Sequence, residues 1–210
     1  RRSSRGLGDV YKRQDVSQAE DNEQAGLARA VFDGIMIMRA HATSEENKVN
    51  GWGVPPVGFG RSGVHGNFYI RGAIQSMRGI VANDAEEAMY MARAKDQNGD
   101  SITSKHTYEL HFPPGQTPPA RYFWSLTVYD QDANLMLNDY DRYAISGNSE
   151  DLIYEDDGSL RILIGGEPPE GMVGNWLPAG ESFTRVTLRV YGPEKAMIER
   201  TWKPPQLKRL

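Results

Sequence analysis

Apolar positions recur at helical spacing near the start of the chain. Between residues 16 and 41 they fall on one side of a helix, namely at Leu27, Val31, Ile35 and Met38. We therefore predict a helix over 16–41, whose broad apolar stripe must be buried. A second helix is expected over 67–81. A third is expected over 85–94, where Asn83 or Asp84 would cap its start.

Beyond Gly99 the period changes from helical to two. Apolar side chains then alternate with polar ones in four runs, 108–112, 122–129, 160–164 and 186–190. A last strand is expected to begin at Ile198. Short strands of this kind, separated by turns and not by helices, are typical of a jelly-roll-like antiparallel β-sandwich. The predicted fold class is thus mainly β with N-terminal helices.

Turn-forming residues divide the chain into parts. A Gly/Pro-rich connector over 44–66 follows the first helix, and a strong turn over 96–100 precedes the strands. We expect 15–97 to form a helical segment with this connector, and 98–210 to form the β domain. Residues 1–14 start without Met, are strongly basic and show no apolar period, so they resemble translated adapter sequence from environmental gene calls. A basic disordered tail is the alternative.

Charge and composition exclude several classes of protein. The chain has 24 basic and 28 acidic residues, and its net charge of -4 lacks the electrostatic footprint of a nucleic-acid binder. It contains no Cys, which excludes disulfides, thiolate metal sites and a Cys nucleophile. No apolar run reaches the ~18 residues that a membrane helix needs, so we expect no transmembrane segment.

Some motifs resemble cofactor or metal sites but lack the neighbouring residues or elements that those sites require. Residues 58–63 match the dinucleotide fingerprint, but Pro55 and Pro56 stand where a strand is needed, so we interpret them as a loop. Residues 130–134 begin like a calcium loop, yet Leu135 occupies the position that requires Gly, and a polar hairpin explains them. The four histidines lack ligand spacing. We predict neither a metal nor a cofactor.

Aromatic residues and two arginines suggest a binding surface. One strand carries rings on both of its faces, Tyr122 and Trp124 on one and Phe123 and Tyr129 on the other. A strand with one solvated face needs rings on only one. We favour the interpretation that protein covers both faces, with the N-terminal helices over the second. The alternative is that one face stacks against a ligand such as a sugar. Arg185 and Arg189 could bind an anion, although pairing with nearby carboxylates is the simpler expectation.

The ordered motifs of the second half resemble a known family. The segments that carry the resemblance are 111–116, 123–130, 142–145, 157–160, 175–179, 188–191 and 202–205. Over roughly residues 48–207 the chain resembles the family catalogued as domain of unknown function 1214. The resemblance implies a jelly-roll-like β domain preceded by helices, commonly downstream of an immunoglobulin-like sandwich, domain of unknown function 1254, in exported bacterial proteins. We therefore expect a periplasmic or envelope-associated protein whose apolar helix is covered by that upstream domain or by self-association.

Two functional hypotheses follow. The first is a binding or structural module with a carbohydrate-like or small apolar ligand. The second is a hydrolase that acts on a glycan or similar substrate through carboxylates in a jelly-roll cleft, such as Glu109 with Asp130. A carboxyl group with a strongly raised pKa would favour the enzyme, and an aromatic groove would favour binding. No catalytic residue is assigned, and Trp176 and Trp202 are expected to anchor the core. The candidate ligand-binding residues are Trp124, Tyr129, Asp130, Arg142, Asn175 and Trp176.

Overall fold

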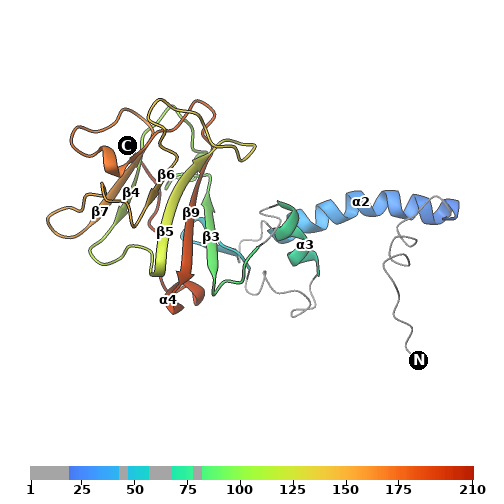
Figure 1. The fold of residues 1–210 in the computed structure, drawn as a ribbon. Helices are drawn as coiled ribbons and strands as arrows, with labels where there is room; N and C mark the ends of the chain where they lie inside the picture. Colours follow the sequence, from blue (N-terminus) through green and yellow to red (C-terminus); the bar gives the residue numbers. More distant parts are fainter. Residues whose placement is uncertain (1–18, 43–46, 57–67, 78–81) are drawn as a thin grey trace.

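The computed structural model describes residues 19–42, 47–56, 68–77 and 82–210, and it shows a β-sandwich with helices beside it (Figure 1). One sheet has the strand order β1 (Lys48–Val49), β2 (Trp52–Gly53), β3 (Ala88–Arg93), β9 (Arg185–Pro193), β5 (Ala120–Tyr129), β6 (Ala144–Ser146). The other has the order β10 (Lys208–Arg209), β4 (Tyr108–Phe112), β7 (Leu160–Ile164), β8 (Trp176–Leu177). Neighbouring strands are antiparallel, except that β7 and β8 are parallel. The predicted mainly β sandwich class is confirmed.

The core lies between the two sheets and is built from alternate strand residues. Leu126 of β5 and Leu188 of β9 are register partners in the six-stranded sheet, and Leu110 of β4 pairs with Ile162 of β7 in the four-stranded sheet. All four are fully buried in one cluster. Burial of each such side chain contributes about 1.5–3 kcal/mol. The residues between them consequently face outward from the sandwich on both sides.

The N-terminal helices stand beside the sandwich. Helix α2 (Asp21–Ala42) confirms the first predicted helix, and α3 (Phe68–Met77) confirms the described part of the second. The two helices contact each other, and Figure 1 shows α2 extending away from the strands. The apolar stripe is exposed in this single chain, where the side chain of Val31 is 60% exposed and that of Phe32 73%. The expected cover by an upstream domain or a second copy stays a prediction. No helix in the described ranges is long and apolar enough to cross a membrane.

The third predicted helix, over 85–94, is wrong, because β3 occupies 88–93. Directly before β3 the chain forms a single turn, in which the Asp84 carbonyl accepts hydrogen bonds from the amides of Glu87 and Ala88. Met and Ala favour helices, but Met89 and Met91 alternate into the core when the segment pairs with β9. Tertiary burial therefore overrides local propensity here.

Two further segments differ from expectation. The strand predicted from Ile198 is wrong, because Lys195–Ile198 forms the short helix α4 and Arg200 then adopts a left-handed conformation with a φ of 59°. Within the predicted connector, β1 and β2 form a hairpin around Asn50 and Gly51, whose φ angles of 48° and 82° fit the two-residue turns typical of hairpins. The predicted motif over 58–63 and residues 1–14 lie outside the described residues.

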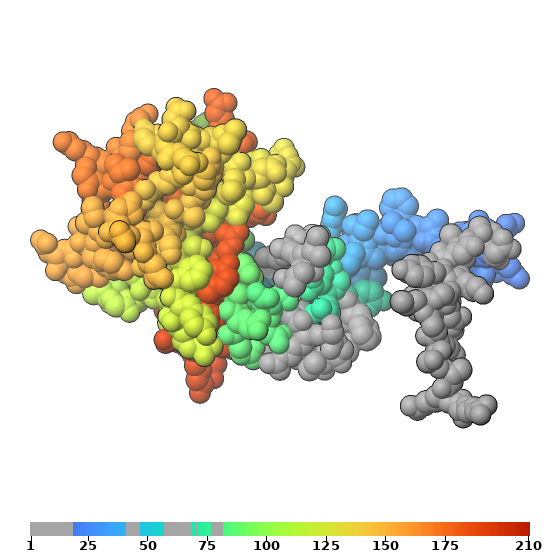
Figure 2. All heavy atoms as spheres, viewed as in Figure 1, coloured from blue at the N-terminus to red at the C-terminus, as the bar shows by residue number. Residues whose placement is uncertain are grey.

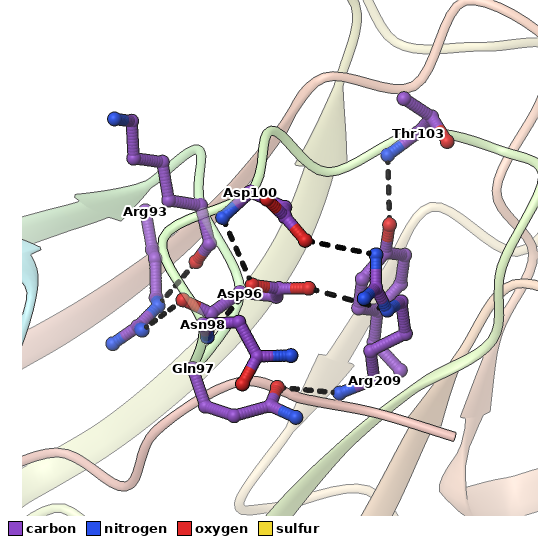
Figure 3. Close-up of polar contacts among 9 residues, drawn as sticks. Arg93, Asp96, Gln97, Asn98, Asp100, Thr103 and Arg209 are labelled. Carbon is purple, nitrogen blue, oxygen red and sulfur yellow. Dashed lines mark hydrogen bonds and ion pairs between the residues drawn. The ribbon is translucent and has the colours of Figure 1, made fainter.

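A polar network fixes the edge of the sandwich where the turn over 96–100 meets β10 (Figure 3). Oδ1 of Asp96 accepts hydrogen bonds from the amides of Asn98 and Asp100, at 2.8 and 3.1 Å. Buried Arg93 donates to the carbonyls of Lys95, Asn50 and Asp96. Its burial lowers the pKa of the guanidinium from its ordinary value, an effect that the charge of Asp96 opposes. These contacts join β3 and the turn between β1 and β2 to the turn over 96–100.

Candidate ligand-binding face

The outer face of the six-stranded sheet gathers aromatic rings and arginines. We call this surface the aromatic–arginine face, and it comprises Tyr90, Phe123, Tyr129, Arg185, Arg189 and Tyr191. Because side chains alternate along a strand, the burial of Val186, Leu188 and Val190 turns the odd-numbered residues of β9 outward. Strand pairing then sets Tyr90 opposite Arg189, Phe123 opposite Tyr191, and Tyr129 opposite Arg185.

One end of the face is aromatic. The rings of Phe123 and Tyr191 stack with centroids 4.5 Å apart, and the ring of Tyr90 meets Tyr191 edge-on at 6.3 Å. Burial raises the pKa of the Tyr90 phenol from its ordinary value, and the neighbouring Tyr191 raises it further through its charge and a side-chain hydrogen bond. Tyr90 therefore stays neutral at physiological pH and keeps its proton for hydrogen bonding. The rings form a partly exposed apolar platform with hydroxyl groups at its rim.

The other end of the face is cationic. The guanidinium carbons of Arg185 and Arg189 lie 5.4 and 5.3 Å from the ring centroid of Tyr129. Arg189 also donates to the hydroxyl of Thr127 at 3.0 Å and to the hydroxyl of Tyr129. The expected pairing of these arginines with carboxylates is wrong, since neither forms an ion pair within the part of the chain described. Nε of Arg185 is buried and finds no acceptor there.

Small side chains lie between the two ends of the face. Ser125 and Thr127 of β5 are the register partners of Arg189 and Thr187 of β9, and Ala92 of β3 pairs with Thr187 on the other side. Both threonines are nearly buried, and the side chain of Arg189 is bonded to one of them. Atoms of β9 remain visible between β5 and β3 in Figure 2. The protein cover that we expected over the rings is thus incomplete, and Phe123 stays 37% exposed.

Two of the six candidate residues, Tyr129 and Asp130, lie at this face. Oδ1 of Asp130 accepts hydrogen bonds from the amides of Asp132 and Asn134, at 2.9 and 2.8 Å. The hydrogen bond from the Asn134 amide is the main reason why the pKa of the Asp130 carboxyl is lowered, and the positive charge of Arg185 adds to it. Asp130 is therefore a turn-forming carboxylate that stays charged beside Arg185.

The third candidate, Trp124, lies on the core side of β5 and is only 5% exposed. Its ring packs against Phe112 of the opposite sheet, with centroids 5.9 Å apart. The indole also lies directly over Gly147, because a Cβ at that glycine would come within 2.8 Å of a ring carbon. Trp124 thus supports the strand that carries Phe123 and Tyr129 and does not itself reach the surface.

The remaining candidates lie together, away from this face, around β8. Arg142 forms an ion pair with Asp151 at 3.0 Å and donates to the Gly174 carbonyl at 2.6 Å. The Asn175 amide group holds the loop at Ile153 through hydrogen bonds with both the amide and the carbonyl of that residue. The indole of Trp176 is buried and donates to the Gly165 carbonyl at 3.0 Å. In these contacts all three side chains serve to hold loops against the sandwich.

A second surface lies on the outer side of the four-stranded sheet. It is an open hollow of about 610 Å³ lined by Glu109, His111, Glu155, Asp156, Asp157, Ser159, Arg161 and Lys208. Two of its four carboxylates are paired with cations, since Arg161 lies 2.8 Å from Glu155 and 3.9 Å from Glu109, and Lys208 lies 3.7 Å from Glu109. Hydrogen bonds from Ser159 lower the pKa of the Asp157 carboxyl, which is the opposite of what a general acid needs.

Glu109 and Asp130, the carboxylate pair considered in the sequence analysis, do not lie together. Glu109 lies in this hollow on β4, whereas Asp130 follows β5 in the other sheet. Among the described residues no group of three His, Cys, Asp or Glu side chains is arranged to hold a metal ion. Sequence reasoning noted Phe123, Arg185 and Arg189 on strand faces. It missed Tyr90, because that residue was placed in a helix.

Comparison with known proteins gives a family and a fold. The family model "Protein of unknown function (DUF1214)" matches residues 87–195, which include β3, β5 and β9 in full. The solved structure of the VPA0106 protein from Vibrio parahaemolyticus is 24% identical with a TM-score of 0.57, over 68% of this chain and 35% of that one. An uncharacterized protein from Burkholderia cenocepacia is 15% identical with a TM-score of 0.42, over 91% and 43% of the chains. This chain thus spans less than half the length of either, and no curated protein matches it.

Proposed function

The chain belongs to the DUF1214 family of proteins of unknown function, and we propose that it is a non-catalytic binding module for a carbohydrate-like ligand. The ligand would lie on the aromatic–arginine face. The observation that carries this proposal is the platform of Phe123, Tyr191 and Tyr90, whose rings are fixed by stacking and edge-on contacts and remain partly exposed.

A sugar ring suits this surface for two reasons. Its C–H faces are apolar and can lie against an aromatic ring, and aromatic side chains supply large contact area at little entropic cost. Its hydroxyl groups require hydrogen-bond partners, and the tyrosine hydroxyls, Ser125 and Arg185 present them on this face. A purely apolar ligand would leave these polar groups without partners, which disfavours it.

The hydrolase alternative has less support. Glu109 lies on the four-stranded sheet and Asp130 follows a strand of the other sheet, and Glu109 and Glu155 in the open hollow are engaged with Arg161 and Lys208. Hydrogen bonds from Ser159 lower the pKa of the Asp157 carboxyl in that hollow. Glycoside hydrolysis needs one carboxyl group that is protonated near neutral pH and a second across the scissile bond.

We also propose a setting for the module, which rests on the family resemblance. The protein would act in the periplasm or at the cell envelope as part of a longer chain. The exposed apolar residues of α2 would then be covered by an upstream domain or by a second copy. Cell fractionation of the full-length protein tests the location, and recovery in the cytoplasm alone would contradict it.

A glycan-binding screen tests the function. The purified chain should bind one class of oligosaccharide in a glycan array, with affinity then measured by isothermal titration calorimetry. Phe123→Ala and Tyr191→Ala should each weaken binding by about tenfold or more, because a stacked ring is lost. Tyr154→Ala is the matched control, since Tyr154 is an exposed tyrosine on the loop held by Asn175, and it should leave affinity unchanged. Absence of binding to every glycan would refute the proposal.

A further inference from the structure

We infer that the ligand of the aromatic–arginine face is an acidic oligosaccharide, of uronic-acid type, whose carboxylate is received by Arg185. This inference rests on the proposed function and adds the charge and the length of the ligand. It is carried by the contacts of the arginines and by the spacing of residues along β9.

Three arginines elsewhere in the sandwich form ion pairs with carboxylates, whereas Arg185 forms no ion pair even with the nearby Asp130. Arg142 pairs with Asp151, Arg161 with Glu155, and Arg209 with Asp96 and Asp100. Arg185, in contrast, makes no hydrogen bond or ion pair with any described residue, and its contact is the ring of Tyr129. Its charge is permanent at physiological pH. Nε of Arg185 is buried, but its two terminal nitrogens form no hydrogen bond with a described residue and can receive an incoming anion.

A carboxylate fits this position better than other anions. The planar fork of a guanidinium binds a carboxylate through two parallel hydrogen bonds, and such charge-assisted bonds are about twice as strong as neutral ones. Arg189 is already committed to Thr127 and Tyr129, so one arginine remains for the ligand. The negative charge of Asp130 next to Arg185, and the net charge of -4, disfavour a densely charged polyanion such as a nucleic acid.

The distance between the two ends of the face sets the length of the ligand. Arg185 and Tyr191 lie on the same face of β9, and a strand rises 3.2–3.4 Å per residue, so their backbones are roughly 20 Å apart. One sugar ring cannot span that distance. A ligand that stacks on Phe123 and Tyr191 and also reaches Arg185 must contain several linked rings. It would run along β9, over the small side chains of Ser125 and Thr127.

The experiment compares probes of equal length and different charge. Tetragalacturonate, a neutral tetraglucoside and a hexaglutamate peptide are titrated into the protein at low ionic strength by calorimetry. Tetragalacturonate should bind about tenfold or more tightly than the neutral tetramer, and added salt should reduce that difference. Arg185→Gln should abolish the preference while leaving the weak binding of the neutral tetramer unchanged. Arg161→Gln removes the same charge on the opposite sheet and should have no effect on either affinity.

The outcomes separate the two proposals. If neither tetramer binds, the proposed function fails and this inference fails with it. If both bind equally and Arg185→Gln changes neither, the face is a sugar site without charge selection, and only the inference is overturned. If hexaglutamate binds as tightly as tetragalacturonate, the face recognises acidic peptides, which also overturns it. Arg185→Lys guards against misfolding, because it keeps the charge and should retain part of the preference.

Discussion

The guanidinium of Arg209 on β10 lies with its Nε 3.5 Å from Oδ2 of Asp96, a carboxylate oxygen that is buried and has no hydrogen-bond donor among the described residues (Figure 3). Nη1 of the same arginine lies 3.2 Å from Oδ2 of Asp100, and the Arg209 amide donates to Gln97 at 2.7 Å. Arg209 therefore neutralises a carboxylate that the fold has removed from water.

Arg209→Ala is expected to destabilise the protein by about 2–3 kcal/mol. Breaking a buried pair leaves one charge uncompensated, and the partial exposure of Arg209 moderates the loss. Urea denaturation followed by circular dichroism measures the change. Lys208→Ala is the control on the neighbouring residue, because its exposed pair with Glu109 should contribute less than about 0.5 kcal/mol. Equal effects of the two variants would contradict this account of Asp96.

Two turns with the same hydrogen bonds, 96–100 and 130–134, carry different residues at their left-handed position. In each, an Asp side chain accepts from the amides two and four positions later, and the residue before the last is left-handed, Gly99 with a φ of 88° and Ala133 with a φ of 67°. Because a left-handed conformation costs an L-residue about 1–2 kcal/mol, Ala133→Gly should stabilise the protein by about 0.5–1 kcal/mol. Gly99→Ala should destabilise it by about 1–2 kcal/mol. Thermal unfolding checks both, and a loss of stability in Ala133→Gly would refute the argument.

Trp176 is expected to act as a structural anchor. Its ring is buried, its Nε1 donates to the Gly165 carbonyl, and Tyr140 meets it edge-on at 4.9 Å. Trp176→Ala should therefore cost about 3–5 kcal/mol of unfolding free energy. Trp202, which is half-buried and donates to Gln116, should cost less when truncated. If Trp176→Ala kept full stability and instead lost ligand binding, the indole would belong to a site.

The apolar surface of α2 is expected to bind apolar dyes or to associate with a second copy. Val31, Phe32 and Met36 are each at least 60% exposed, and contiguous apolar patches above ~300–600 Å² are uncommon on monomers. Phe32→Glu with Met36→Glu should reduce dye fluorescence and shift sedimentation toward the monomer. Arg29→Gln with Asp33→Gln, on the same helix, should leave both unchanged. A dye-negative monomer before any substitution would contradict this prediction.

The sequence predicted the strands whose alternation is regular and missed elements that tertiary pairing determines. The segments around Leu110, Leu126, Ile162 and Leu188 place an apolar side chain at every second position, and each forms the expected strand. The segment 88–93 combines helix-favouring residues with a period of two, and only its pairing with β9 resolves the conflict. No local signal could place Tyr90 beside Arg189, because that contact depends on this pairing.

The candidate site was predictable in the same limited way. Alternation placed Arg185 and Arg189 on the same face of one strand, and it placed Phe123 and Trp124 on opposite faces of another. Whether an arginine pairs with a carboxylate depends on contacts between residues that are distant in the sequence. The expected pairing of Arg185 and Arg189 with carboxylates was wrong for this reason. Arg142, Asn175 and Trp176 are polar or aromatic residues next to turns, a pattern that a ligand site and a buried loop anchor share.

Mapping of bound ligand by NMR tests the central claim most directly. Uniformly ¹⁵N-labelled protein is titrated with tetragalacturonate, and amide shifts are followed residue by residue. We expect the largest changes on β9 from Arg185 to Tyr191, with further changes at Phe123 and Tyr90, and no change around Glu155. Shifts confined to the hollow at Glu109 and Glu155 would favour the carboxylate site instead, and the absence of any shift would contradict the aromatic–arginine face as a ligand site.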